Sequence, residues 1–215
     1  MNIFRIFIIT FSYYLIGCNG DISNKKNNNQ KNFQKVKIYS VPSSFTFAGE
    51  SIPLDLPDVR ERFDKELHVN SYLHSSTILL LKRARRWLPQ ISEILKSNDI
   101  PEDFKYLPVI ESGLENAISY KRAVGFWQFL APTARENGLT VNNEIDERYD
   151  PIKSTYAAVK YLKKANKKFD NWISSAASYN RGIRGIENSI KSQKVNDFFS
   201  LYLNKETTRY IYRIL

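Results

Sequence analysis

The stretch PEDFKYLPVIESG, residues 101–113, carries the start and stop signals of one short helix. Pro101 suits the first helical position, and the two acidic residues that follow it favour the positive end of the helix dipole. Gly113 is well placed to end the helix, and Pro108 predicts a kink or a tightened turn inside it. The stretch therefore predicts a helix that ends close to Glu111.

Helical signals continue on both sides of this stretch, and no segment alternates convincingly between apolar and polar residues with period two. Asp150 and Pro151, for example, form a cap and a first-turn proline at the start of a longer helix. The expected helices cover residues 78–88, 91–96, 132–138, 151–169, 172–179, 195–203 and 206–215, with a further helix suggested at 59–67. The predicted fold class is mainly α.

Glu111 lies on the apolar side of the helix that ends at Gly113. Phe104, Leu107 and Glu111 are spaced i, i+3 and i+7, so they share one helix face. Burial disfavours the ionised form of a carboxyl group and raises its pKa, as a general acid that works near neutral pH requires. The alternative is an ordinary glutamate at the rim of a fraying helix end.

The composition limits the possible partners and cofactors. The chain has 215 residues, and its hydrophobic fraction of 42% excludes a mostly disordered chain. Its formal net charge of +10 predicts an anionic partner. A single cysteine excludes a disulfide framework and a cysteine-rich metal site. His68 and His74 are interpreted as surface or interhelix residues, and neither a metal nor another cofactor is expected.

The N-terminus has the pattern of an export signal. After Arg5, residues 6–16 form an apolar run of about 11 residues, whereas a membrane-spanning helix needs roughly 20. The run ends in Leu-Ile-Gly before Cys18, which resembles the bacterial lipobox. The alternatives are an ordinary signal peptide or a hydrophobic N-terminal strand.

On the lipobox interpretation, residues 1–17 are a lipoprotein signal peptide and Cys18 receives lipid. Residues 18–58 would then be the lipidated cysteine and a flexible polar tether, and residues 59–215 the domain. Export argues against nucleic acid as a partner. For an exported protein, the basic cluster at residues 82–86 is interpreted as a solvated helix face, or alternatively as a surface that binds anionic cell wall or lipid.

Four motifs in series resemble the lytic murein transglycosylases, which have a lysozyme-like soluble-lytic-transglycosylase domain. The motifs are Glu-Ser-Gly at 111–113, Ser119, AVGFWQF at 123–129 and ASYN at 177–180. Glu111 and Gln128 are 17 residues apart, and Gln128 and Tyr179 are 51 apart. The resemblance covers residues 59–215, and the segment NKETTRY at 204–210 points to the membrane-bound type D subgroup.

The resemblance implies that Glu111 is the catalytic acid and base. It also implies supporting or substrate-contacting roles for six further residues: Ser112, Ser119, Gly125, Gln128, Tyr179 and Asn180. Gly125 would let the backbone and a sugar approach closely, because it has no Cβ. Trp127 and Phe129 are interpreted as core residues rather than as a platform for sugars.

Three positions depart from the family pattern. Ser178 replaces a usual alanine, the pair Phe126-Trp127 replaces smaller aliphatic residues, and Arg122 stands where many relatives have glycine. None of the three removes a catalytic group. No second acid is marked by an apolar setting, since Glu115, Glu144, Asp146 and Glu147 lie outside the helix or in polar sequence.

The implied reaction cleaves the bond between N-acetylmuramic acid and N-acetylglucosamine in peptidoglycan without water, and leaves a 1,6-anhydromuramoyl end. The expected partners are glycan strands and, through the lipid anchor, a membrane. The expected location is the periplasmic side of the bacterial envelope, at the outer membrane. The alternatives are a hydrolytic muramidase or chitinase, a non-catalytic peptidoglycan-binding lipoprotein, and a basic lipoprotein that binds anionic lipid.

Overall fold

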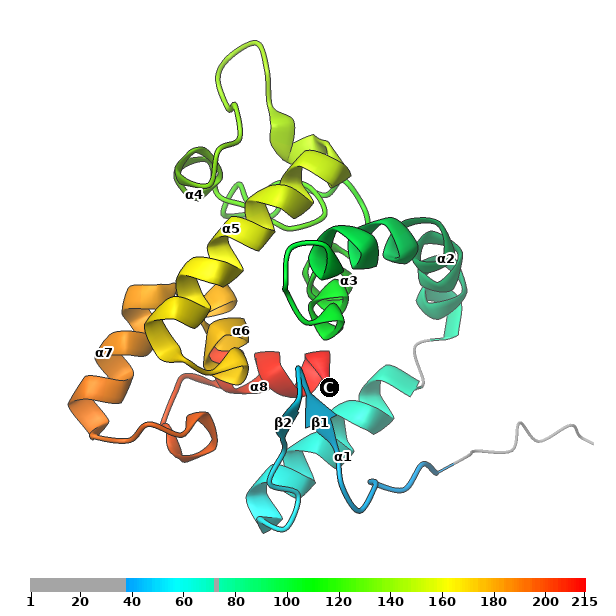
Figure 1. Cartoon of the computed structure of the whole chain (residues 1–215). Coiled ribbons are helices and arrows are strands. Elements are labelled where there is room, and N and C mark those ends of the chain that lie inside the picture. The colour runs from blue at the N-terminus through cyan, green and yellow to red at the C-terminus, as the bar shows by residue number, and fades with distance from the viewer. Residues whose placement is uncertain (1–37, 72–73) are drawn as a thin grey trace, which may run out of the picture. The chain divides into compact units, whose positions relative to one another are not determined.

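A computed structural model describes residues 38–71 and 74–215 of the chain, and Figure 1 shows their arrangement. The predicted signal peptide and Cys18 lie outside the described residues. The α-helices are α1 (Pro57–Ser71), α2 (His74–Lys96), α3 (Leu107–Ser112), α4 (Ala131–Glu136), α5 (Pro151–Phe169), α6 (Trp172–Arg181), α7 (Ile183–Gln193) and α8 (Lys205–Ile214). Three 3₁₀ helices, η1 (Glu102–Tyr106), η2 (Glu147–Tyr149) and η3 (Phe198–Ser200), connect them.

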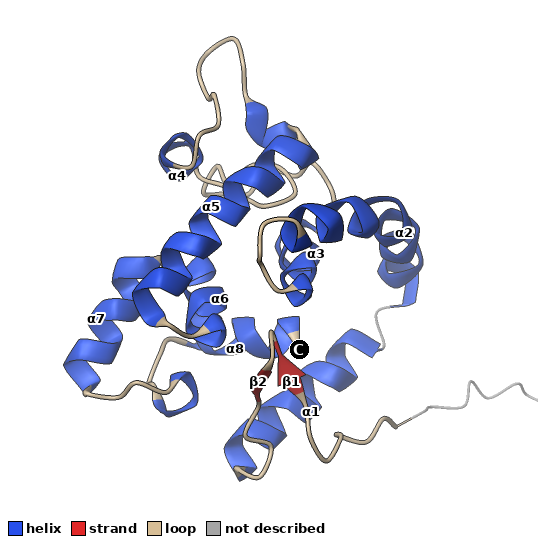
Figure 2. Ribbon diagram, in the orientation of Figure 1, coloured by secondary structure: helices blue, strands red, loops and turns tan. Residues whose placement is uncertain are grey.

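The mainly α prediction is confirmed, since helices dominate the described residues (Figure 2). The expected helix at 101–113 is divided into η1 and α3, because Pro108 has no N–H and cannot continue α-helical bonding from the preceding turn. In contrast, α2 runs through Pro89, so the helices expected at 78–88 and 91–96 are one element.

The prediction of a helix at 195–203 was wrong, and the sequence analysis named no helix for residues 183–193. Residues 183–193 form α7, whose apolar residues Ile183, Ile186 and Ile190 follow a helical spacing. The helix expected at 195–203 is only the short η3, followed by extended backbone. There Leu201 and Leu203 are buried while Tyr202 between them is exposed, which is the alternation of an extended segment.

The packed part of the chain begins before residue 59, so residues 46–54 do not belong to the tether in which the sequence analysis placed them. Strands β1 (Thr46–Phe47) and β2 (Glu50–Ser51) form an antiparallel hairpin, and Phe47, Ile52 and Leu54 are buried in the core. The prolines of this region and the two-residue strands left no periodic pattern to recognise.

The hairpin is attached to the N-terminus of α6. The Glu50 carboxylate accepts hydrogen bonds from the backbone N–H groups of Trp172 and Ile173, and from the Asn171 side chain. These N–H groups have no partner inside the helix, and a negative charge there is favoured by the helix dipole. On the other side, Ala48 donates its backbone N–H to Asp103 of η1 at 2.7 Å.

Helix α6 is at the centre of the packing, in contact with α5, α7 and α8. Its buried residues are all small apart from Ile173, which lets the neighbouring helix axes approach closely. The buried hydroxyls bond to backbone carbonyls: Ser175 donates to Asn171 and Ser178 donates to Ser175. This packing holds the C-terminal end of α6, with Tyr179 and Asn180, against α8.

Candidate active site

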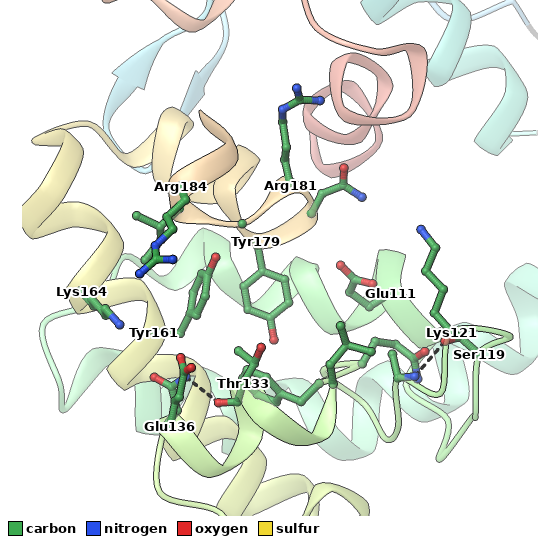
Figure 3. A pocket seen from close by; sticks show the side chains of 18 of the residues that line it. Glu111, Ser119, Lys121, Thr133, Glu136, Tyr161, Lys164, Tyr179, Arg181 and Arg184 are labelled. Atoms are coloured by element: carbon green, nitrogen blue, oxygen red, sulfur yellow. Dashed lines mark hydrogen bonds between the residues drawn. The ribbon is translucent and has the colours of Figure 1, made fainter. Parts of the chain in front are cut away.

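A cavity of about 1290 Å³ opens between the loop before α4, the inner face of α5, the α6–α7 turn and the start of α8. Its walls include five of the seven residues that the sequence analysis assigned to the site: Glu111, Ser119, Gln128, Tyr179 and Asn180. Figure 3 shows Glu111 and Tyr179 directed into this space from different helices. Ser112 and Gly125 do not line it.

Glu111 is positioned by the last turn of α3. Gly113 ends this helix in the left-handed conformation with φ 63°, and its N–H returns to the carbonyl of Val109. The half-buried Glu111 carboxyl accepts a hydrogen bond from the hydroxyl of Tyr210 on α8 at 2.6 Å. The carboxyl group is therefore fixed between two helices that are 99 residues apart in the chain.

Removal from water raises the pKa of Glu111 from 4.5 to about 7. The hydrogen bond from Tyr210 and the positive charge of Arg213 oppose this change, while the negative charge of Glu206 adds to it. Desolvation outweighs the opposing effects, so the carboxyl is partly protonated at neutral pH. Such a group can both donate and accept a proton under physiological conditions.

Helix α8 has four attachments that place Tyr210. Asn204 caps its N-terminus, and Thr207 donates its hydroxyl to Asn180 at 2.9 Å. Arg209 forms a bidentate ion pair with the buried carboxylate of Glu66 on α1. Arg213 donates to the backbone carbonyl of Ile110, next to Glu111.

Tyr210 was missed as a site residue, although its segment supported the type D resemblance. The side chain is 3% exposed and lies on the buried face of α8 with Thr207, Ile211 and Ile214. The spacing i, i+3, i+4 and i+7 reveals that face in the sequence. It does not reveal that the hydroxyl on it meets a carboxyl group from α3.

Tyr179 and Asn180 lie close to the acid without bonding to it. The Tyr179 hydroxyl donates to the carbonyl of Trp127 at 2.8 Å, and burial raises the pKa of Tyr179, with a further contribution from the charge of Glu111. Asn180 donates to Glu206 and accepts from Thr207. Their observed contacts hold the cleft wall together, and their contact with substrate remains a prediction.

The loop at 117–129 places Gln128 and Ser119 on the opposite wall. Gln128 has φ 49°, and both N–H bonds of its amide are directed to the carbonyls of Ala117 and Gly125. The amide oxygen is therefore the group with which Gln128 would accept a hydrogen bond from a ligand. Ser119 accepts the backbone N–H of Ala123, which closes the turn at Arg122.

Gly125 makes a close approach, but to the protein's own backbone and not to the cleft. A Cβ at Gly125 would lie 1.9 Å from the carbonyl oxygen of Arg148. Ser112 is also internal: its hydroxyl donates to the carbonyls of Pro108 and Phe126 and accepts the N–H of Glu115. Both residues shape the site from behind, so direct sugar contacts from them are not supported.

Arg148 is a structural residue that the sequence analysis did not single out. It is 7% exposed, pairs with Asp146 at 2.6 Å and donates to the carbonyls of Arg122 and Phe129. Arg122 has φ 62°, a conformation that glycine adopts without strain, and the bond from Arg148 fixes its carbonyl. Trp127 is fully buried and donates to Thr155, as expected for a core residue.

Three of the four acids considered as a second catalytic group are engaged elsewhere. Arg148 lowers the pKa of Asp146, and Lys153 lowers the pKa of Glu147. Glu115 forms an ion pair with Arg83. Among the residues that the structure describes, Glu111 is thus the acid of the cleft whose pKa is raised toward neutrality.

Fold and site together define a class of helical domains that present a half-buried, protonatable carboxyl group to an open cleft. The chain belongs to the transglycosylase SLT domain family, whose model matches residues 90–201. This confirms the resemblance that the motifs at 111–113, 123–129 and 177–180 indicated.

Named relatives agree with this assignment. The chain is 33% identical over 180 residues, 80% of its length, to the membrane-bound lytic murein transglycosylase D of Escherichia coli strain K12 and to that of strain O6:H1. It is 30% identical over 132 residues to a protein of Alteromonas sp. (strain M-1) named for tributyltin chloride resistance. The chain spans 39% of the length of the two Escherichia coli relatives.

We predict that Gly125→Ala destabilises the domain by about 2–3 kcal/mol more than Gly49→Ala, as measured by urea unfolding. Both glycines have φ near 80°, at 82° and 81°, but a Cβ at Gly49 meets nothing within 4 Å. Gly49→Ala therefore reports the backbone strain alone, about 1 kcal/mol. Equal losses for the two variants would show that the contact with Arg148 does not constrain the loop.

Tyr210→Phe should raise the pKa of Glu111 above its value of about 7, because the lost hydrogen bond favours the ionised carboxyl. The measurement is a ¹³C NMR titration of glutamate side chains, with Glu111→Gln to assign the resonance. Tyr212→Phe is the matched control, since it removes a hydroxyl from another buried tyrosine of α8. An unchanged or lower pKa in Tyr210→Phe would contradict the assigned hydrogen bond.

Proposed function

We propose that the protein is a peptidoglycan lytic transglycosylase in which Glu111 is the single acid and base. The observation that carries the proposal is the position of Glu111: a half-buried carboxyl with a pKa of about 7, at the wall of an open cavity of about 1290 Å³. Membership of the transglycosylase SLT domain family supports the substrate class. The named activity of the Escherichia coli relatives supports the reaction.

In the first step, the protonated Glu111 donates its proton to the oxygen that joins C1 of N-acetylmuramic acid to N-acetylglucosamine. The C1–O bond breaks, the N-acetylglucosamine end leaves as an alcohol, and the acetamido group of the muramoyl residue stabilises the positive charge at C1. Tyr210 donates to the carboxylate that remains, which limits the cost of leaving that charge away from water.

In the second step, the Glu111 carboxylate accepts the proton of the muramoyl C6 hydroxyl, and the C6 oxygen bonds to C1. The products are a 1,6-anhydromuramoyl end and a protonated Glu111, with no net consumption of water. A second carboxylate is unnecessary because the nucleophile is part of the substrate and is already close to C1. A pKa near neutrality suits a group that gives and regains a proton in one turnover.

The proposed location is the bacterial cell envelope. The lipobox-like sequence before Cys18 supports a lipid anchor on the periplasmic face of the outer membrane. Within residues 38–71 and 74–215, no helix has both the length and the apolar character needed to cross a membrane. The name of the Escherichia coli relatives includes "membrane-bound", in agreement with an anchored protein.

Mass spectrometry of muropeptides released from sacculi tests the reaction. The wild-type protein should release products with 1,6-anhydromuramoyl ends, and Glu111→Gln should lower the release rate by at least about 100-fold. Glu61→Gln, which alters an exposed glutamate on α1, should leave the rate unchanged. Reducing muramic acid ends would instead identify a hydrolytic muramidase, and undiminished release by Glu111→Gln would exclude Glu111 as the acid.

A further inference from the structure

One arm of the cleft is lined by cations that the proposed reaction does not use. Lys164, Lys167 and Lys168 lie on α5 at the spacing i, i+3 and i+4, on the same face as Tyr161. Arg184, near the start of α7, faces the same cavity, whereas Figure 3 shows the side chain of Arg181 directed away from Lys164 and Arg184. In Figure 3, Lys164 and Arg184 lie on the side of the pocket away from Glu111, with the two tyrosines between.

Few of these charges are neutralised by the protein itself. Lys168 pairs with Glu187 at 2.8 Å, and Glu187 also binds Lys191 from outside the cleft. In the part of the chain that the structure describes, no carboxylate lies within ion-pair distance of the three others, Lys164, Lys167 and Arg184. The acids beside these cations, Glu136 and Glu187, are fewer than the cations, so this arm keeps a surplus of positive charge.

A surplus of this kind is unfavourable in the empty cleft and favourable when an anion binds. Like charges from α5 and from the start of α7 face one cavity, so their mutual repulsion is relieved by a negatively charged ligand. The N-acetylated sugars of a glycan strand offer no matching charge. The peptide side chains carried by the muramoyl residues do, because they contain free carboxylates.

We propose that this arm, defined by Lys164, Lys167, Lys168 and Arg184, binds carboxylates of the peptide side chains on the glycan strand. The proposal rests on the function proposed above and adds a preference for strands that carry peptides. The arm and Glu111 line one continuous cavity, so one bound strand reaches both.

The test compares binding of two polymers: glycan strands that carry their peptides, and bare strands from which an amidase has removed the peptides and whose newly freed lactyl carboxyl groups have then been converted to amides. Binding is measured by sedimentation with Glu111→Gln in the full chain, so that no strand is cleaved. The peptide-bearing strands should bind more tightly, and their advantage should fall as salt concentration rises.

The variant Lys164→Gln/Lys167→Gln, in the same background, should weaken binding of peptide-bearing strands about three- to tenfold and leave binding of bare strands unchanged. Lys163→Gln is the matched control, because Lys163 is exposed on the same helix but does not line the cleft. Equal binding of the two polymers, or an equal loss with Lys163→Gln, would overturn the proposal.

The outcomes also separate the two proposals. Release of anhydro ends at equal rates from both polymers, with equal binding, would leave the proposed reaction intact and overturn the peptide-binding arm. Peptide-dependent binding without anhydro products from the wild-type protein would support the arm and contradict the reaction. Equal competition by a sulfated polysaccharide at the same charge concentration would overturn the assignment to peptide carboxylates.

Discussion

The contact between Glu111 and Tyr210 is the constraint on which the site depends. It joins the end of α3 to the middle of α8, and it forms only if α8 lies across the end of α3. The bidentate pair between Arg209 and Glu66 holds α8 on α1, and the bond from Arg213 to Ile110 holds it on α3. Glu66 is buried whereas Arg209 is exposed, so loss of Arg209 would leave a buried carboxylate without its partner, and these contacts together over-determine the position of α8.

The same contact explains how the site balances two requirements. A carboxyl that donates a proton near pH 7 must be desolvated, yet a carboxylate left without any partner would be too costly to form. Desolvation of Glu111 raises its pKa, whereas the Tyr210 hydroxyl and the Arg213 charge limit that increase. The result is a group poised between its two states, which a fully apolar or a fully exposed position would not provide.

Local patterns in the sequence predicted the residues whose role is local. The helix signals of residues 101–113 placed Glu111 at a helix end, and the apolar spacing indicated that its pKa would rise. The motif series also assigned Gln128, Tyr179 and Asn180 to one site, and all three line the same cavity. Periodicity and motif order are both properties of short windows, so they were sufficient for these conclusions.

Features that depend on distant parts of the chain could not be predicted in this way. The hairpin at 46–51 is stabilised by Glu50 on the N-terminus of α6, more than 120 residues away, and leaves no periodic pattern. Gly125 was expected to let the backbone approach a sugar, whereas the close approach in the structure is to the backbone of Arg148. Tyr210 was recognisable as buried, while its partner was visible only in three dimensions.

The most direct test is the free energy of unfolding of the wild-type protein and of Glu111→Gln, measured in urea from pH 4 to pH 9. Because the folded state holds Glu111 at a pKa of about 7, against 4.5 for an unperturbed group, the wild type should lose stability relative to the variant between those values. Above pH 7, the loss in unfolding free energy of the wild type relative to Glu111→Gln should level off at about 3 kcal/mol. Parallel stability curves across the whole range would contradict the account, since they would mean that Glu111 titrates in the folded protein as it does in water.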